Sequence, residues 1–315
     1  MSGLPLVASG SSFRETTDSR LVAVVGDAAL DLSFAVPALD GIDEKVAATD
    51  CRHELGGTGA NAAAAVVRLG GRARLHSVIG SDPIGLFILE QLAARGIDTA
   101  GVSVVEGRST AAVILRSPGR RLVVVDRGVA DDGPRLDPAI VAADAALVYL
   151  SATPWATIAS LIAGSAVPVV VGIEARQGSE LAAVGTPEEV ARVLDHALVV
   201  LTNEAGADAL TAPLHQLAAA ALVVTRGSAG ATIVVPGRPL VEVSAPTVDV
   251  VDATGAGDRF AGALCRFLAC GTSLERAVRL ATIAASLSTR QLGAQAGIPG
   301  EPEVLARFRR APGSD

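Results

Sequence analysis

Short valine-rich apolar runs alternate with longer segments rich in alanine and leucine from residue 21 onward. Runs of this length are typical of strands buried on both faces, and helices between such strands let them pair in parallel. We assign strands to Leu21–Val25, Ala145–Leu150, Val167–Val171, Leu198–Leu201 and Leu222–Thr225. The sequence therefore predicts an α/β fold, a three-layer sandwich around a mostly parallel sheet.

Helices are predicted between several of these strands. One places Ile84, Phe87, Ile88 and Leu92 on a single face and ends before Gly96, because a glycine commonly follows the last turn of a helix. Three further helices are predicted over residues 61–69, 258–270 and 274–290. The main domain is predicted to span residues 21–310, and residues 1–20 are predicted to form a disordered tail.

Two segments interrupt the alternation of strands and helices. Residues 30–53 and 110–127 have the pattern of two-faced strands joined by turns, including the turn Ser117-Pro118-Gly119. Open α/β sheets bind ligands at the edge formed by the carboxyl ends of their strands. We therefore expect the two segments to form a small β lid over that edge.

Composition restricts the partners and the location of the chain. A net charge of −7, with acidic and basic residues interspersed, argues against a nucleic-acid partner. Apolar runs are cut by glycine, proline or charge before they reach about 18 residues, so no membrane association is expected. Three cysteines without a C-x-x-C pair indicate a reducing, cytoplasmic environment.

The most informative motif is Asp252-Ala253-Thr254-Gly255-Ala256-Gly257-Asp258, which opens a predicted helix. Small residues let the backbone approach a ligand closely, and the first turn of a helix presents unpaired amides to an anion. A carboxylate at this point can accept a proton beside a transferred phosphate. The alternative is a simple glycine turn in which Asp258 caps the helix.

The run V-D-A-T-G-A-G-D-R-F, residues 251–260, resembles the C-terminal signature of the ribokinase-like (PfkB) carbohydrate kinase family. The N-terminal half carries a second such resemblance in Gly56-Gly57-Thr58-Gly59-Ala60-Asn61, followed by Gly80-Ser81-Asp82. Motifs at residues 202–204, 225–230 and 293–299 keep the family's order. The resemblance covers residues 21 to about 308.

The resemblance implies roles for individual residues. Asp258 would be the catalytic base, and the amides of Gly255, Ala256 and Gly257 would hold the migrating phosphate. Asp31, Gly56, Gly57 and Asn61 would bind the substrate. Carboxylates and amides in a covered pocket suit a polyol, because such a pocket rejects analogues that lack the matching hydroxyl.

The nucleotide and ion sites follow from the same resemblance. Asn203 would lie near the phosphates of ATP and Mg²⁺, and the nucleotide would be bordered by the turn that contains Thr225, Gly227 and Gly230. Asp252 and Thr254, with the loop of residues 289–297, resemble the monovalent-cation site that some members use, which would bind K⁺.

The chain departs from the family pattern at five positions, one of which is Ala29, where ribokinases often have asparagine. Gly206 stands where the family often has the glutamate of Asn-x-x-Glu, Thr58 replaces a lysine of ribokinases, and Gly297 replaces a frequent serine. Arg259 follows the predicted base where a small residue is usual. Two interpretations of Arg259 remain open, contact with a phosphate or exposure to solvent.

Other phosphate and cofactor motifs do not match. Lys45 is the only lysine and is followed by valine, which excludes a Walker-type loop. The segment of residues 26–31 lacks the G-x-G-x-x-G of dinucleotide-binding folds. The four histidines are not spaced as metal ligands.

The sequence thus predicts an ATP-dependent kinase that phosphorylates a hydroxyl of a sugar or sugar-like molecule, with a lid that excludes water and pairs two chains into a homodimer. Two alternatives remain open. The acceptor could be a nucleoside, which the 3% aromatic content disfavours, or the chain could be a sugar- or nucleotide-binding homologue without turnover.

Overall fold

The computed structural model describes residues 20–39, 45–132, 136–151, 153–174, 186–293, 295 and 297–310. Most of the tail predicted over residues 1–20 lies outside these ranges, as do residues 40–44 of the first lid segment and Ala294 of the C-terminal motif. Within them, no helix combines the length and the hydropathy that crossing a bilayer requires.

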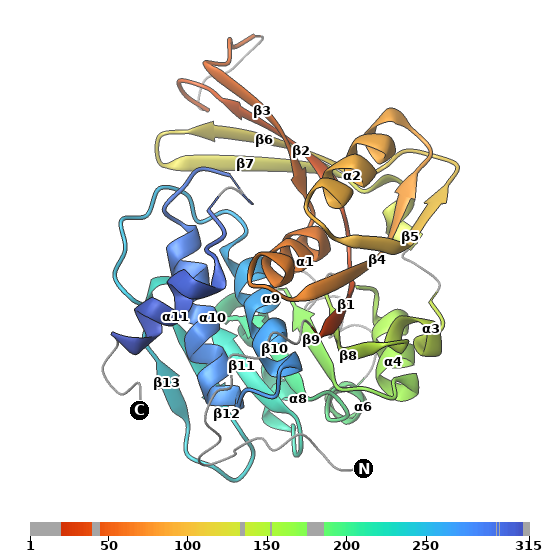
Figure 1. The fold of residues 1–315 in the computed structure, drawn as a ribbon, viewed down its shortest axis with the longest axis vertical. Helices are drawn as coiled ribbons and strands as arrows, with labels where there is room; N and C mark the ends of the chain where they lie inside the picture. The colour runs from red at the N-terminus through yellow and green to blue at the C-terminus, as the bar shows by residue number, and fades with distance from the viewer. Residues whose placement is uncertain are drawn as a thin grey trace.

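A large sheet forms the centre of the molecule (Figure 1). Its strands among the described residues are, in spatial order, β13 (Val241–Val243), β12 (Ala231–Val234), β11 (Ala221–Thr225), β10 (Val199–Asn203), β9 (Val169–Ile173), β8 (Ala145–Leu150), β1 (Leu21–Val25), β4 (Arg72–Gly80) and β5 (Asp98–Val105). All pairings from β11 to β5 are parallel, and β12 and β13 are antiparallel additions. Strand β9 begins two residues later than predicted, after Pro168, which has no amide hydrogen to donate.

Helices cover both faces of this sheet and create two separate apolar cores. One face carries α1 (Thr58–Arg68), α2 (Pro83–Ala94), α9 (Ala256–Ala269), α10 (Leu274–Ser288) and α11 (Glu301–Arg309). The other carries α3 (Pro138–Ala142), α4 (Trp155–Gly164), α6 (Pro187–Leu194), α7 (Glu204–Ala209) and α8 (Thr211–His215). Strand β1 shows why its run is continuously apolar, since Val22 and Val24 enter one core and Ala23 and Val25 the other.

A second, small sheet lies at one end of the molecule, beyond α1 and α9 (Figure 1). Its order is β3 (Asp50–Gly56), β2 (Ala29–Ala35), β6 (Ala111–Ser117) and β7 (Arg120–Asp126). β2 pairs antiparallel with β3, β6 pairs antiparallel with β7, and the central β2–β6 pair is parallel. The three-layer fold and the separate small sheet predicted from the sequence are therefore confirmed.

Small residues allow α1 and α9 to pack closely. A Cβ atom on Gly262 would lie 2.3 Å from the carbonyl oxygen of Ala62 and 2.8 Å from the Cβ of Ala65, so only glycine fits at this contact. The two helices come from opposite halves of the chain and carry the two strongest sequence motifs at their N-terminal ends. Their close packing brings those motifs together.

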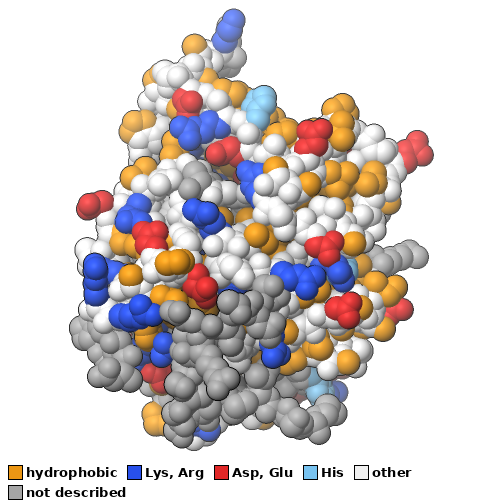
Figure 2. All heavy atoms as spheres, viewed as in Figure 1, with side chains coloured by type: hydrophobic (Ala, Val, Ile, Leu, Met, Phe, Trp, Pro, Cys, Tyr) orange, Lys and Arg blue, Asp and Glu red, His pale blue; other side chains and the backbone are white. Residues whose placement is uncertain are grey.

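Charged side chains of both signs are distributed over the surface. On the face shown in Figure 2, Lys and Arg side chains are interspersed with Asp and Glu. The described part of this face therefore alternates in charge, which is unlike the continuous cationic surface that tracks a polyphosphate backbone.

Candidate active site

The candidate site lies at the carboxyl edge of the large sheet, where the strand order reverses between β1 and β8. Asp27 follows β1, Ser151 follows β8, and Thr58 begins α1. The Ser151 hydroxyl donates to Thr58 Oγ1 (2.9 Å), and Thr58 Oγ1 donates to the Asp27 carboxylate (2.7 Å). This hydrogen-bonded chain fixes the start of α1 to two adjacent strands.

Asp27 is a residue whose role the sequence did not reveal. Its carboxylate accepts hydrogen bonds from the amides of Thr58 (2.8 Å) and Gly59 (3.4 Å), and so stabilises the first turn of α1. The sequence signal that could have indicated this role is a carboxylate directly after a predicted buried strand. The N-cap residue itself is Gly57, with φ 93°, and a Cβ there would approach the Asp27 carbonyl oxygen to 2.6 Å.

Helix α9 begins in the way an anion site requires. Gly255 is its N-cap residue in the left-handed conformation, with φ 71°. The Ala256 amide donates to the Ala253 carbonyl (3.1 Å), whereas the amides of Gly257 and Asp258 belong to the first helical turn and have no carbonyl four residues earlier within the helix. A Cβ on Gly257 would meet no atom within 4 Å, so space for a ligand adjoins the helix start.

Asp258 is held by a residue from the other half of the chain. Asn61 Nδ2 donates to Asp258 Oδ2 (2.9 Å), and Gln295 Nε2 donates to Asn61 Oδ1 (2.9 Å). Burial raises the pKa of Asp258 to about 8, although the hydrogen bond from Asn61 favours the ionised form. The resemblance assigned Asn61 to the substrate, and in the structure its amide orients the carboxylate.

Asp31 lies on β2 of the small sheet, directly against the first motif. A Cβ on Gly56 would meet the Asp31 carboxyl oxygens at 2.2–2.3 Å, so glycine is required beside it. Burial raises the pKa of Asp31 to about 6; Arg121 on β7 opposes this shift, whereas Asp27 and Glu54 add to it. The predicted residues Asp31, Gly56, Gly57, Asn61 and Asp258 are thus gathered around one end of α1.

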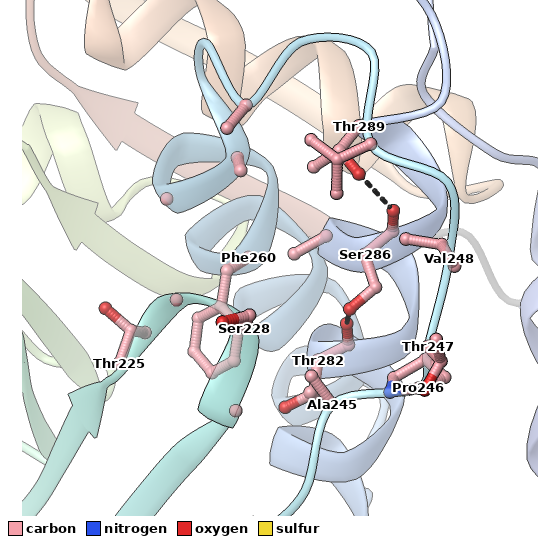
Figure 3. Close-up of a pocket in the computed structure, with 17 residues that line it drawn as sticks. Thr225, Ser228, Ala245, Pro246, Thr247, Val248, Phe260, Thr282, Ser286 and Thr289 are labelled. Carbon is pink, nitrogen blue, oxygen red and sulfur yellow. Dashed lines mark hydrogen bonds between the residues drawn. The ribbon is translucent and has the colours of Figure 1, made fainter.

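On the other side of the α9 start lies a cavity of about 440 Å³, within the range of small-molecule sites (Figure 3). It is lined by Thr225, Gly227, Ser228, Gly230, Ala245, Pro246, Thr247, Val248, Val250, Ala253, Ala256, Gly257, Phe260, Thr282, Ala285, Ser286 and Thr289. None of these described lining residues is charged. A Cβ on Gly227, φ 54°, would meet no atom within 4 Å, so the turn at residues 227–230 leaves open space beside it.

The α10 contribution to this cavity was not predicted. Thr282, Ala285, Ser286 and Thr289 follow the i, i+3, i+4, i+7 spacing of one helical face. The Thr289 hydroxyl donates to the Ser286 carbonyl (2.8 Å) and the Ser286 hydroxyl to the Thr282 carbonyl (2.9 Å), which keeps these side chains along the helix (Figure 3). The row of small residues at helical spacing is the sequence signal that could have indicated this contribution.

A smaller, polar cavity of about 80 Å³ joins the ends of β9, β10 and β11 to Asp258. Its lining includes Glu174 after β9, Asn203 at the end of β10 and Thr225 at the end of β11. Asn203 is the N-cap residue of α7, and its Oδ1 accepts a hydrogen bond from the Gly206 amide (2.8 Å). Glu174 is thus a carboxylate beside Asn203 and Asp258 that the sequence motifs had not indicated.

The geometry explains why a side chain is excluded at Gly206. A Cβ there would lie 2.2 Å from Thr202 Oγ1, whose hydroxyl donates to the Ile173 carbonyl (2.8 Å). A glutamate at this position would break that contact between β9 and β10. The carboxylate absent from the Asn-x-x-Glu pattern is therefore incompatible with the packing, and Glu174 faces the same cavity from the neighbouring strand.

Asp252 stabilises the loop that precedes the start of α9 through hydrogen bonds. Its Oδ1 accepts hydrogen bonds from the Thr254 amide (2.9 Å) and hydroxyl (2.6 Å), and its Oδ2 accepts one from the Gly293 amide (3.0 Å). Burial alone would raise the pKa of Asp252, but these hydrogen bonds hold it below its ordinary value.

Both interpretations of Arg259 are wrong. The residue is 1% exposed, and its guanidinium donates to the carbonyl of Ser288 (3.2 Å), the hydroxyl of Ser288 (2.9 Å) and the carbonyl of Gly293 (2.6 Å). Neighbouring residues on a helix point about 100° apart, so Arg259 lies to one side of Asp258. It binds the C-terminal loop instead of solvent or the cavity at Asp258.

The fold and these cavities define an α/β protein in which the start of α9 lies between a neutral cavity and a group of carboxylates. The family model described as pfkB family carbohydrate kinase matches residues 19–301. The chain is 31% identical over 293 residues to the ribokinase of Bacillus subtilis, covering 90% of this chain and 98% of the relative.

Two solved structures show the same fold. The ribokinase of Arabidopsis thaliana complexed with ribose and ATP has a TM-score of 0.78 at 26% identity, covering 91% of this chain and 98% of that one. A nucleoside kinase of Burkholderia thailandensis in complex with inosine has a TM-score of 0.77 at 23% identity, covering 93% and 98%. The chain belongs to the pfkB family of carbohydrate kinases, which confirms the resemblance found in its sequence.

Proposed function

We propose that this protein transfers the γ-phosphate of ATP to a hydroxyl group of a sugar or sugar-like molecule. The observation that carries the proposal is the hydrogen bond from Asn61 to Asp258, because it joins the two halves of the chain at a carboxylate that lies between two regions of different chemistry. The neutral cavity lies on one side of this junction, and Asp31 with the Gly56-Gly57 turn lies on the other.

In the proposed reaction, Asp258 accepts the proton of the acceptor hydroxyl as its oxygen attacks the γ-phosphorus. A new P–O bond forms to the acceptor, the bond to the β-phosphate oxygen breaks, and ADP leaves. The amides of Gly257 and Asp258, in the first turn of α9, stabilise the charge on the transferred group, whereas the Ala256 amide is already bound to the Ala253 carbonyl. Because the family model is that of carbohydrate kinases, a polyol is the preferred acceptor.

The acceptor is proposed to bind between α1 and the small sheet. Asp31 would accept hydrogen bonds from its hydroxyls, and the turn at Gly56 and Gly57 would let it approach the backbone. The small sheet would serve as a lid, since ATP beside an open base would otherwise be hydrolysed by water.

The nucleotide is proposed to occupy the neutral cavity, with its phosphates toward Gly257 and its base toward α10. Small side chains such as Ala285 and Ser286 leave room for a flat ring. Thr225, Gly227 and Gly230 would border the nucleotide from the opposite side.

Mg²⁺ fits the polar cavity between Glu174, Asn203 and Asp258. Magnesium prefers oxygen ligands and is usually held by one or two carboxylates together with substrate phosphates. Glu174 supplies a carboxylate and Asn203 an amide oxygen at that point. When bound, the ion would neutralise charge on the phosphates during transfer.

We also propose a homodimer in the cytoplasm. Leu122, Val123, Val124 and Val125 on the outer strand β7 are 41–58% exposed, and an exposed apolar edge strand favours pairing with another chain. Pairing of two such edges would satisfy the unpaired backbone groups along β7. The free cysteines among the described residues fit a reducing compartment.

The proposal is tested by ADP release from ATP and Mg²⁺ with a panel of pentoses, hexoses, sugar acids, phosphosugars and nucleosides. One sugar-type acceptor is expected to stimulate release far above the rate without acceptor, with ³¹P NMR showing a phosphomonoester product. Reactions without Mg²⁺ provide the control. Stimulation by nucleosides alone would overturn the sugar assignment, and binding of ADP without any acceptor-dependent release would favour a binding protein.

A further inference from the structure

Arg259 places a permanent positive charge inside the protein, directly behind the proposed anion site. A buried charge is costly unless it is paired and hydrogen-bonded. Among the described residues, three oxygen acceptors bind the guanidinium at 2.6–3.2 Å, two on Ser288 and one on Gly293. Asp252, Asp258 and Glu54 supply negative charge near it.

The acceptors of Arg259 are Ser288, the last residue of α10, and Gly293 in the loop that supports the proposed anion site. Gly293 accepts from Arg259 through its carbonyl and donates to Asp252 through its amide. Asp252 in turn holds Thr254, the residue before the N-cap of α9. Arg259, Gly293 and Asp252 therefore form one hydrogen-bonded frame around the start of that helix.

This frame does not fit a bound potassium ion. Carbonyl and carboxylate oxygens are the ligands that hard cations use, but here the Ser288 and Gly293 carbonyls already bind Arg259. Gly297 offers no side-chain ligand, and a Cβ at that position would lie 2.2 Å from the Ser288 carbonyl oxygen. Among the described residues, the Ser288 and Gly293 carbonyls thus bind a guanidinium.

We propose that Arg259 is a built-in cation that replaces the monovalent cation suggested by Asp252, Thr254 and the loop of residues 289–297. It is a positioning residue, since it acts through the loop and adds positive potential behind the α9 amides that receive phosphate. Turnover and nucleotide binding then require no added K⁺. The role in turnover rests on the proposed kinase function.

The test compares KCl with choline chloride at an equal ionic strength of about 0.1 M. ADP affinity by calorimetry, melting temperature and acceptor-dependent turnover are measured for the wild type, Arg259→Ala and Arg266→Met. Arg266 is a matched control because it is also buried on α9, at 3% exposure, but it binds the Leu69 carbonyl, away from the site.

The wild type is expected to give the same three values in both salts, within about twofold. Arg259→Ala is expected to bind ADP about tenfold more weakly in choline, and K⁺ or low millimolar guanidinium is expected to restore affinity and melting temperature. Arg266→Met is expected to melt earlier in either salt without any cation dependence. Tenfold stimulation of the wild type by K⁺ would overturn the proposal, as would an Arg259→Ala variant no more cation-dependent than Arg266→Met.

If Arg259→Ala does not fold, Arg259→Lys and Arg259→Gln replace it. Lysine keeps the charge, so it is expected to bind ADP about tenfold more tightly than glutamine in choline; equal affinities would contradict the inference. Failure of the kinase proposal would appear as a lack of acceptor-dependent turnover. The dependence of the melting temperatures on the added cation would still test the role of Arg259.

Discussion

The two sides of the α9 start are built from different chemistry. The side proposed for the nucleotide is lined by neutral and mostly small residues such as Thr225, Ala285 and Ser286. The side proposed for the acceptor contains carboxylates, among them Asp31 and Asp258, whose pKa values burial raises to about 6 and about 8. Ligand binding on the first side thus depends on the shape of the cavity and on backbone groups, whereas binding on the second side depends on the protonation state of its carboxylates.

This difference indicates which kinetic constants a substitution on each side should change. Changes on the neutral side alter the space for a ligand and should act on its KM. Changes on the acidic side alter hydrogen bonds and proton transfer, which govern acceptor affinity and kcat. Substitutions that change both KM values equally would contradict this division into two sides.

The largest effect expected on the acceptor side, apart from loss of the base, is that of Asp31→Asn. Removing a charged hydrogen-bond acceptor should raise the acceptor KM about 10- to 100-fold, because such bonds contribute about 1.5–3 kcal/mol. The KM for ATP should change little. Steady-state kinetics with either substrate varied gives both values, and an equal rise in the two would contradict the division into sides.

The pH profile separates the two carboxylates. A base must be ionised, so kcat/KM for the acceptor should fall tenfold per pH unit below the pKa of about 8 of Asp258. Below about 6, protonation of Asp31 should steepen the fall. Asp31→Asn should remove the steeper part only, and a profile that is flat from pH 6 to 9 would refute the assignment.

On the neutral side, Ala285→Leu should fill part of the cavity and raise the KM for ATP about tenfold, with acceptor KM unchanged. Glu275→Leu, in the first turn of the same helix and about 15 Å along its axis, serves as the control. Unchanged ATP affinity in Ala285→Leu would place the nucleotide elsewhere.

The smallest effect on chemistry is expected from the outer strand of the small sheet. Val124→Asp on β7 should convert the proposed dimer to a monomer, as measured by sedimentation, while kcat changes less than about threefold. Ile140→Asp, at an equally exposed apolar position on α3, should leave the dimer intact. A monomeric wild type would exclude the proposed pairing.

The sequence predicted the layers because strands such as β1 and β8 are continuously apolar and buried on both faces. It also indicated candidate site residues, because glycine-rich turns mark close backbone approach, as at Gly57 and Gly255; their functional roles stay predictions. Roles that depend on tertiary contacts could not be predicted from the sequence. The direction of Arg259 and the position of Glu174 depend on which loop or strand lies beside them, which no local pattern records.

The central claim is tested most directly by Asp258→Asn, which keeps the shape of the side chain and removes the base. We expect kcat with the preferred acceptor to fall about 10²- to 10⁴-fold, while ADP affinity by calorimetry and the melting temperature stay close to those of the wild type. Turnover retained within about threefold would contradict the account, because the carboxylate held by Asn61 would then not be the base.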